Sequence, residues 1–514
     1  MRYPEYLQAV RLNLNLEIPR FAFVRKQEVA ISVFTLSIRT FPCRITLRHR
    51  GIAAAVLACL MAAPSQLQAA DVTQPVTSAD IGDKMSLTLA QLSRDFGVQG
   101  TIPARQFHQR IATTAQAHPS LLSAVEQNET ARAFVRESYS AWLPQISTSV
   151  DGRITRTDTL GDYQLAETQH NSDYNVTLRQ MVFDFGAAAA GVSSARARSR
   201  GAAERLSTKE AEVALQAITA YLEVLKSRQL MALAVDNDES RQAIVAMVRE
   251  RYELGGGSRA DITRAEARLT DAQAGRVAAE VALRSAEAGY LEMFGELPGL
   301  TPMPTDAPLE ALDWTADTLA ERFGGLREAR ENLDASRADA RLARARLLPT
   351  LNLELSAGRR DQDLVGTPYT EKSAHLTIRY NLYSGGADLA RRSQAVHRAR
   401  QAEQDTEALE RQVVRAIDQS LAQVRNADRL VKARRAAVQG ASDSLLAVKE
   451  QFAYRRGSLL DLLRSQEELY VSGNQFISEI IERSRSRYRF LFLTAGLEPL
   501  LNIATPGSAT GENP

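Results

Sequence analysis

The chain has few of the residues on which disulfide-linked domains, metal sites and nucleic-acid binders depend. Its 514 residues include 2 cysteines, 6 histidines and 6% aromatic side chains, and its formal net charge is +2. This near balance of charge disfavours a nucleic-acid binder as an interpretation of the whole chain. No run of about 18 apolar residues occurs, so a helical membrane transporter is excluded.

The histidines give no catalytic or metal-binding pattern. None belongs to an HExxH motif, and no Gly-x-Ser-x-Gly nucleophile elbow is present. Gly255–Gly257 follows no predicted strand and precedes no phosphate-binding lysine, which disfavours nucleotide binding. We therefore predict no enzyme activity, no catalytic residue, no metal and no cofactor. The histidines are scattered over His49, His108, His118, His170, His375 and His397.

A signal peptide is predicted near the N-terminus. A basic segment, Arg48–Arg50, precedes the short apolar run 51–63 and a small-residue exit at Ala69–Ala70. Residues 1–69 are then a signal peptide with an extended or mis-assigned N-terminal region, and a buried Ala-rich helix is the alternative. Cleavage after Ala69 removes nine basic and three acidic residues, so the formal charge moves from +2 to −4.

Both cysteines, Cys43 and Cys59, lie in the segment that cleavage would remove. The mature chain would then have neither a disulfide nor a cysteine nucleophile. Val56–Cys59 faintly resembles a lipobox, but Leu57 fits it poorly and the apolar run continues beyond the cysteine. Lipidation of Cys59 stays open as the less favoured alternative.

An internal repeat of about 200 residues organises the rest of the chain. Each copy is predicted to contain a helix, two strands, a very long helix, a glycine-marked break and another helix. Three segments recur in the same order: Ala141–Pro144 with Arg346–Pro349, Met181–Gly186 with Asn381–Gly386, and Tyr252–Asp261 with Phe452–Asp461. The predicted boundaries are an N-terminal segment at 70–103, repeats at 104–300 and 316–498, a linker at 301–315 and a disordered tail at 499–514.

Apolar and polar residues alternate in four segments, as expected for strands with one apolar face. At roughly 10–13 residues the segments suit tilted membrane strands, although a half-buried soluble sheet would show the same alternation. His375 falls on a polar face, where we expect it to line a pore. The strands are predicted at about 145–158, 172–184, 350–359 and 372–384, with long polar loops at about 159–171 and 359–371.

Four membrane strands require partners. Single-chain outer-membrane barrels begin at about eight strands, and unpaired sheet edges are not tolerated in lipid. If the strands span a membrane, the chain must therefore form an oligomer, in which two copies would give eight strands and three would give twelve.

The longest helices are predicted at about 187–252 and 387–454, where no proline interrupts the sequence. Each would reach on the order of 100 Å. Their apolar residues form narrow stripes, which is typical of coiled-coil seams. A soluble coiled-coil rod fits the helices equally well, and the strands at fixed points of both repeats disfavour it.

These segments resemble the TolC-like family of bacterial outer-membrane channels over about 104–498. The resemblance rests on the strand entries Leu143–Pro144 and Leu348–Pro349, the strand exits Phe183–Gly186 and Tyr383–Gly386, and the turn Arg251–Gly255 leading to Asp261. It implies a mostly α protein with a membrane β-barrel: a homotrimer in which each protomer gives four strands and long coiled-coil helices form a tapering periplasmic tunnel.

The resemblance also implies a function. Such channels are passive exit ducts in the outer membrane that receive substrate from an inner-membrane ABC or RND-type transporter through a periplasmic adaptor protein. Many efflux members look like lipoproteins, so the poor lipobox favours type I protein secretion over multidrug or metal efflux. A non-conducting periplasmic coiled-coil scaffold is the alternative from another class.

Two sets of site residues come from the resemblance. The helix–helix turns would form the periplasmic tip that contacts the adaptor, namely Gly255, Gly256, Gly257 and Ser258 in one repeat and Arg456, Gly457 and Ser458 in the other. Asp461 falls on the first acidic position of the family's periplasmic gate, but Arg464 occupies the second. At i, i+3 these two side chains could pair and leave the gate less negative. The alternative for Asp461 is a helix N-terminal residue that faces water.

Overall fold

The computed structural model describes residues 101–158, 166–299, 301–307, 309, 315–362, 367–454 and 456–501. All of them belong to the second of two compact units, Pro75–Pro514. The expected signal peptide, the segment that follows it to residue 100 and the tail from residue 502 lie outside the described residues.

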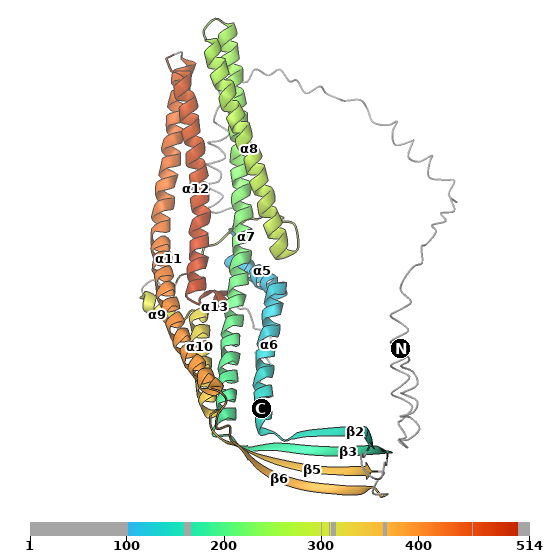
Figure 1. Ribbon diagram of the computed structural model, residues 1–514. Coiled ribbons are helices and arrows are strands. Elements are labelled where there is room, and N and C mark those ends of the chain that lie inside the picture. Colours follow the sequence, from blue (N-terminus) through green and yellow to red (C-terminus); the bar gives the residue numbers. More distant parts are fainter. Residues whose placement is uncertain are drawn as a thin grey trace, which may run out of the picture. The chain divides into compact units, whose positions relative to one another are not determined.

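Figure 1 shows a small sheet joined to long helical hairpins. The first half of the chain contains β1 (Thr101–Ile102), α5 (Ala104–Ala117), α6 (Pro119–Tyr139), the 3-10 turn η3 (Ser140–Trp142), β2 (Gln145–Asp158), β3 (Ala166–Phe183), α7 (Ala187–Glu253) and α8 (Arg259–Phe294). The second half contains β4 (Met303–Pro304), α9 (Ala316–Ala320), α10 (Gly324–Ala345), β5 (Thr350–Gln362), β6 (Tyr369–Arg379), α11 (Ala387–Ala453), α12 (Leu459–Leu493) and α13 (Leu497–Leu501).

The two long helices confirm the predicted repeat. Helices α7 and α11 each have 67 residues and begin 200 residues apart. Both start from a glycine in the left-handed region, Gly186 at φ 86° and Gly386 at φ 83°, a conformation that glycine adopts without a steric penalty. A polar side chain satisfies backbone N–H groups at each start: Asp184 accepts from Gly186 N at 3.0 Å, and Ser384 accepts from Asp388 N at 3.2 Å.

The four long strands form one antiparallel sheet in the order β2-β3-β5-β6. The register places apolar residues opposite one another: Leu178 faces both Ile146 and Leu355, and Leu353 faces Leu376. Because successive side chains of a strand point to opposite faces, the apolar residues share one face and the polar residues the other.

Both faces of this sheet are largely exposed in the protomer, the apolar face included. Ile146, Ile154 and Ile378 are 70%, 68% and 72% exposed. On the polar face Thr177 is buried, and the Ser356 and Ser373 hydroxyl oxygens lie 2.6 Å apart in a hydrogen bond. We call the sheet inverted because its apolar face is uncovered, whereas in a soluble protein that face would be covered.

The strand bounds correct the predicted ones at four strand ends. Residues 166–171, expected in a loop, belong to β3, and β5 and β6 likewise extend into the expected loop 359–371. Strand β6 ends at Arg379 rather than near residue 384. Residues 380–386, which were expected to continue the strand at least in part, form an irregular segment that leads into α11. Asn381 and Ser384 in this segment both donate to Asp388 of α11, at 3.2 and 2.7 Å.

Helix packing places most of the core around α7. Helix α7 packs against α6, α8, α10 and α12, and α11 packs against α10 and α12. One core cluster joins Phe107 of α5, Tyr221 of α7 and Tyr488 of α12, where the Tyr488 hydroxyl lies 3.1 Å from His108 Nε2. No helix in the described ranges has the length and hydropathy to cross a membrane.

Helix α13 corrects the predicted tail. The disordered segment was expected from residue 499, yet residues up to Leu501 are helical and Leu501 is buried. Leu497 and Leu501 belong to the same core cluster as Phe107, so apolar burial orders this turn.

Candidate functional site at the helix-hairpin turns

The turn between α7 and α8 is built from backbone hydrogen bonds and one capping box. Gly255 has φ 75°, and its N–H donates to Tyr252 O at 2.9 Å. Gly256 N donates to Arg251 O at 2.9 Å, while Arg251 Nε donates back to Gly256 O at 3.1 Å. The predicted turn at Gly255–Ser258 is thus confirmed as a turn, and its left-handed residue is a glycine as the geometry requires.

Ser258 caps α8. Its hydroxyl accepts from Asp261 N at 3.2 Å, and the Asp261 carboxylate accepts from Ser258 N at 3.2 Å. Asp261 also pairs with Arg264 at 3.5 Å. The Asp261 carboxylate therefore forms its hydrogen bonds and its ion pair within the first turns of its own helix.

The turn between α11 and α12 is closed more tightly. Arg456 N and Gly457 N both donate to Gln451 O, at 2.9 and 3.0 Å. A Cβ on Gly457 would lie 2.9 Å from Phe452 N, so the backbone approaches too closely for a side chain here. Ser458 caps α12 by accepting from Leu460 N at 3.1 Å.

The structure brings the two turns together. They share a groove of about 230 Å³, lined on one side by Arg251, Gly256 and Gly257 and on the other by Phe452 and Gly457. The Arg251 guanidinium lies over the Phe452 ring, 5.0 Å from its centroid. Sequence analysis missed this contact, because an offset of 200 residues does not show which turn lies beside which.

Asp461 and Arg464 are both exposed on the first turns of α12. Within the part of the chain that the structure describes, no ion pair joins them, although their spacing allowed one. An exposed i, i+3 pair contributes only a few tenths of a kcal/mol, which water can offset. In the protomer the Asp461 carboxylate is therefore not neutralised by Arg464.

An ion pair between a buried arginine and an exposed glutamate, behind the turns, was also missed by the sequence analysis. Arg241 of α7 is 1% exposed, and it donates to Glu467 of α12 at 2.8 Å and to Leu463 O at 3.3 Å. Burial lowers the pKa of Arg241, and the Glu467 carboxylate opposes that effect. This pair joins the two helical hairpins near their turns, and a charged residue inside an apolar stripe was the signal for it.

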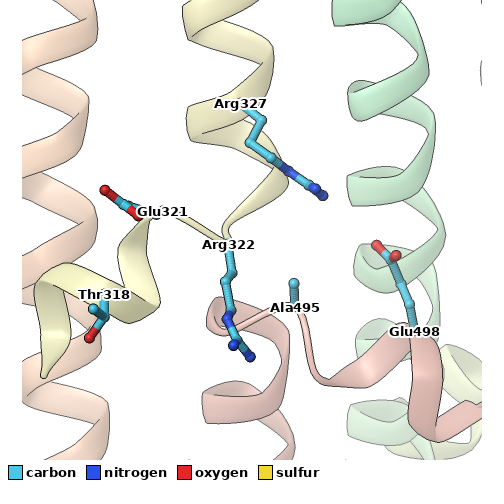
Figure 2. Close-up of a pocket in the computed structure, with 6 residues that line it drawn as sticks. All are labelled: Thr318, Glu321, Arg322, Arg327, Ala495 and Glu498. Carbon is cyan, nitrogen blue, oxygen red and sulfur yellow. The ribbon is translucent and has the colours of Figure 1, made fainter. Parts of the chain in front are cut away.

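Figure 2 shows a second hollow, which no residue of the two turns lines. It lies where the segment from α9 to α10 approaches α13. It measures about 640 Å³ and is lined by Arg322, Arg327 and Glu498, among others. Arg327 pairs with Glu204 at 2.9 Å, and Ser207 donates to Glu498 at 2.5 Å. Both signs of charge line it, so it has no preference for one kind of ion.

Glu210 lies on α7 near this hollow and is 2% exposed. Burial, reinforced by the negative charge of Glu498, raises the pKa of Glu210 to about 7. Its Oε1 has no hydrogen-bond partner in the described residues. A carboxyl group of this kind changes charge near neutral pH and makes the packing of α7 sensitive to pH.

A duplicated chain that joins an inverted four-stranded sheet to helical hairpins of this length has the fold of the TolC-family channels. The chain belongs to the outer membrane efflux protein family, whose model matches residues 111–296 and 316–478.

Relatives and a solved structure agree with this assignment. The chain is 29% identical over 344 residues to the outer membrane efflux protein BepC of Brucella suis, covering 64% of this chain and 72% of BepC. It is 25% identical over 423 residues to the alkaline protease secretion protein AprF of Pseudomonas aeruginosa, covering 77% and 86%. The crystal structure of the outer membrane protein VceC of Vibrio cholerae matches with a TM-score of 0.67 and 15% identity, covering 77% of this chain and 96% of VceC.

Proposed function

We propose that the chain forms the outer-membrane exit duct of an export system, with no catalytic step of its own. The observation that carries this proposal is the inverted sheet: its apolar face is exposed and its polar face is hydrogen-bonded. Lipid is the environment that covers such a face without a protein partner. Arg179 and Glu354, 3.0 Å apart on the polar face, would line a water-filled interior.

The duct is a homotrimer in this proposal. Strands β2 and β6 are the two edges of the sheet, and an unpaired edge is not tolerated in lipid. Pairing β2 of one protomer with β6 of the next closes the sheet, and three protomers give a barrel of about twelve strands. The resemblance to the TolC family supports three copies rather than two.

The proposed cargo is protein, delivered by a type I secretion system. AprF, whose name specifies protease secretion, covers 77% of this chain, whereas BepC covers 64%. BepC is the more identical of the two at 29% against 25%, and its name specifies efflux. Multidrug or metal efflux is therefore the second candidate function.

The helix-hairpin turns would form the periplasmic tip. Gly255–Ser258 and Arg456–Ser458 meet at one groove, which supports a single docking surface for a periplasmic adaptor and, behind it, an inner-membrane ABC or RND-type transporter. Asp461 is exposed and has no ion pair within the described ranges, which supports its role in a negative gate. Arg464 is the second gate residue and would moderate the charge of that ring.

Single-channel conductance of the detergent-purified mature protein in a planar bilayer tests the duct. We expect uniform conductance steps from a heat-modifiable oligomer extracted from the outer membrane. A soluble periplasmic rod that gives no conductance would replace the duct with the coiled-coil scaffold.

The cargo is tested in a strain that lacks the gene. Loss of one or more secreted proteins, restored by the wild-type gene and without a change in drug or metal sensitivity, is the expected result. Unchanged secretion with increased sensitivity to drugs or metals would assign the chain to efflux.

A further inference from the structure

The helix ends that adjoin the sheet carry a large excess of arginine. Residues 130–139, 187–202, 337–349 and 387–401 together contain thirteen arginines and three carboxylates. These segments are the sheet-proximal ends of α6, α7, α10 and α11, which converge where the strands begin (Figure 1). We name them the arginine collar.

The opposite ends of the hairpins have no such excess. Residues 236–275 and 443–470, which include both turns, contain thirteen carboxylates and ten basic residues. A solvated helix surface therefore does not by itself produce the collar in this chain. The charge is placed selectively at the sheet.

Many collar arginines have no carboxylate partner. Five of the thirteen pair with a carboxylate: Arg198 with Asp339 and Arg391 with Asp388 inside the collar, and Arg132, Arg200 and Arg337 with Glu129, Glu331 and Glu403 just outside it. The side chains of six exposed arginines have no hydrogen bond or ion pair in the described ranges: Arg136, Arg344, Arg346, Arg392, Arg398 and Arg400. Clustered cations without protein counter-charges repel one another and attract anions from outside the protomer.

The collar lies within reach of the end of the sheet. Arg346 is four residues before β5, Arg136 is three residues before the end of α6, and Arg392 is five residues after the start of α11. At about 1.5 Å per helical residue, Arg136 and Arg392 lie within about 10 Å of the helix ends that adjoin the sheet. The headgroup layer of a bilayer has a similar depth, of the order of 5–7 Å on each side.

Exposed aromatic residues mark the boundary between the sheet and the collar. Trp142, Phe183 and Phe185 are 42%, 53% and 49% exposed. Tyr139 packs edge-on against Trp142 with centroids 5.5 Å apart, and the Arg196 guanidinium lies over the Tyr139 ring at 5.3 Å. Tryptophan and tyrosine concentrate at the interface between the headgroups and the hydrocarbon, so the collar begins where phosphate groups are expected.

We propose that the arginine collar binds the phosphate groups of anionic phospholipids in the periplasmic leaflet of the outer membrane. The proposal rests on the proposed function, because it needs the sheet to span the membrane. A guanidinium presents paired donors that match two phosphate oxygens, and clustered basic residues beside a membrane span attract anionic lipid. Continuity with the apolar face and its aromatic boundary favours lipid over an acidic polypeptide inside the tunnel.

The test compares two variants with the same loss of charge. The collar variant replaces Arg136, Arg344, Arg346 and Arg392 with glutamine. The control variant replaces Arg105, Arg259, Arg415 and Arg429 with glutamine. These four control residues are also exposed and unpaired in the described residues but lie away from the sheet.

Native mass spectrometry of the detergent-purified oligomer counts bound phosphatidylglycerol against phosphatidylcholine. We expect wild type and control to retain phosphatidylglycerol at least about five-fold over phosphatidylcholine, and the collar variant to lose that preference. An equal preference in all three proteins would overturn the proposal. Loss of the preference in wild type on adding inorganic phosphate would assign the site to free phosphate and also overturn it.

Conductance separates this proposal from the proposed function. A wild type that conducts but shows no lipid preference removes only the lipid proposal, whereas a wild type without conductance removes the duct. Poly-glutamate tests the acidic-polypeptide alternative in the same bilayer. Block of wild type and control but not of the collar variant would place the collar on the tunnel wall and overturn lipid binding.

Discussion

The two hairpin turns contain the same residues at the same spacing but use them differently. Ser258, Asp261 and Arg264 in the first repeat correspond to Ser458, Asp461 and Arg464 in the second. Asp261 is held in a capping box and an ion pair, whereas Asp461 has neither among the described residues. An identical pattern therefore produces a structural carboxylate in one turn and a free carboxylate in the other.

The cause lies in what else anchors each helix start. The first turns of α12 bury Leu459, Leu462 and Leu463 in the core cluster behind the turns. At the start of α8 the residues between the cap and Asp261 are Arg259 and Ala260, both exposed, so polar capping takes a larger part. Apolar burial of several side chains contributes a few kcal/mol, more than one cap, and so Asp461 is not needed to start its helix.

The largest effect is expected when Asp461 is replaced by alanine. Asp461→Ala should change single-channel conductance and cation preference by about two-fold or more, because a carboxylate near the axis attracts cations. Asp261→Ala should leave conductance unchanged and cost about 1 kcal/mol through the lost cap. Conductance in a planar bilayer and urea unfolding in detergent measure the two effects.

The comparison fails if both variants conduct alike. Equal conductance in wild type, Asp461→Ala and Asp261→Ala would move the gate away from Asp461. Arg464→Ala is then the next variant, since a conductance change there would keep the gate on the first turns of α12.

The second prediction concerns Glu210 and its counterpart 200 residues on, Glu410. Glu210 is buried with its pKa raised to about 7, whereas Glu410 is exposed and lies 3.6 Å from Arg330. The native state holds the Glu210 proton more tightly than the unfolded state, whose pKa is near 4.5. Stability from this group is therefore present below about pH 4.5 and lost as pH rises through about 7.

Glu210→Gln should remove this pH dependence. Relative to wild type, the variant should gain about 3 kcal/mol between pH 4.5 and 8, the free energy of the shift from 4.5 to about 7. Urea unfolding at a series of pH values measures the gain, and Glu410→Gln should show little of it. Parallel curves for wild type and Glu210→Gln would mean that water reaches the Glu210 carboxylate and removes the effect of burial on its pKa.

The repeat and the sheet were predictable because their signals are local. Alternation along the chain predicted β2 at its observed bounds, and the absence of proline predicted both 67-residue helices within two residues of their ends. The end of β6 was missed because Asn381 and Ser384 bond to Asp388, which alternation does not encode.

Contacts between helices were not predictable from periodicity. A stripe of apolar residues shows that a helix has a buried face but does not show its neighbour. For that reason the Arg251–Phe452 contact and the Arg241–Glu467 pair were missed. Glu210 was missed because its pKa is raised by burial and by Glu498, which lies at the far end of the second repeat, and both effects depend on packing between distant segments.

The third prediction compares glycines of the two turns. Gly457→Ala should cost about 1–3 kcal/mol, because its Cβ would lie 2.9 Å from Phe452 N, a backbone atom that cannot give way alone. At Gly256 the nearest atoms would be Arg251 Cγ and O at 3.5 Å, an ordinary contact, so alanine should be tolerated. Thermal unfolding in detergent should separate the two variants clearly, and equal midpoints would contradict the tighter geometry of the second turn.

The smallest effect is expected where the strands pass into the long helices. Phe185 has φ 54° in the first repeat, and Gly385 holds the equivalent position at φ 64°. A left-handed conformation costs about 1–2 kcal/mol for a residue with a side chain. Gly385→Ala should therefore cost about 1 kcal/mol through the backbone alone, since a Cβ there meets nothing within 4 Å.

Phe185→Gly should change stability by less, because two effects oppose each other. The substitution removes the backbone strain but also the edge-on contact with Phe183, whose ring centroid lies 4.7 Å away. Such aromatic pairs contribute about 0.5–1.5 kcal/mol, close to the strain that is relieved. A net change within about 0.5 kcal/mol is expected from urea unfolding in detergent, with Gly385→Ala measured beside it. A loss well above 1 kcal/mol would show that the ring at Phe185 holds the junction more strongly than its contact with Phe183 accounts for.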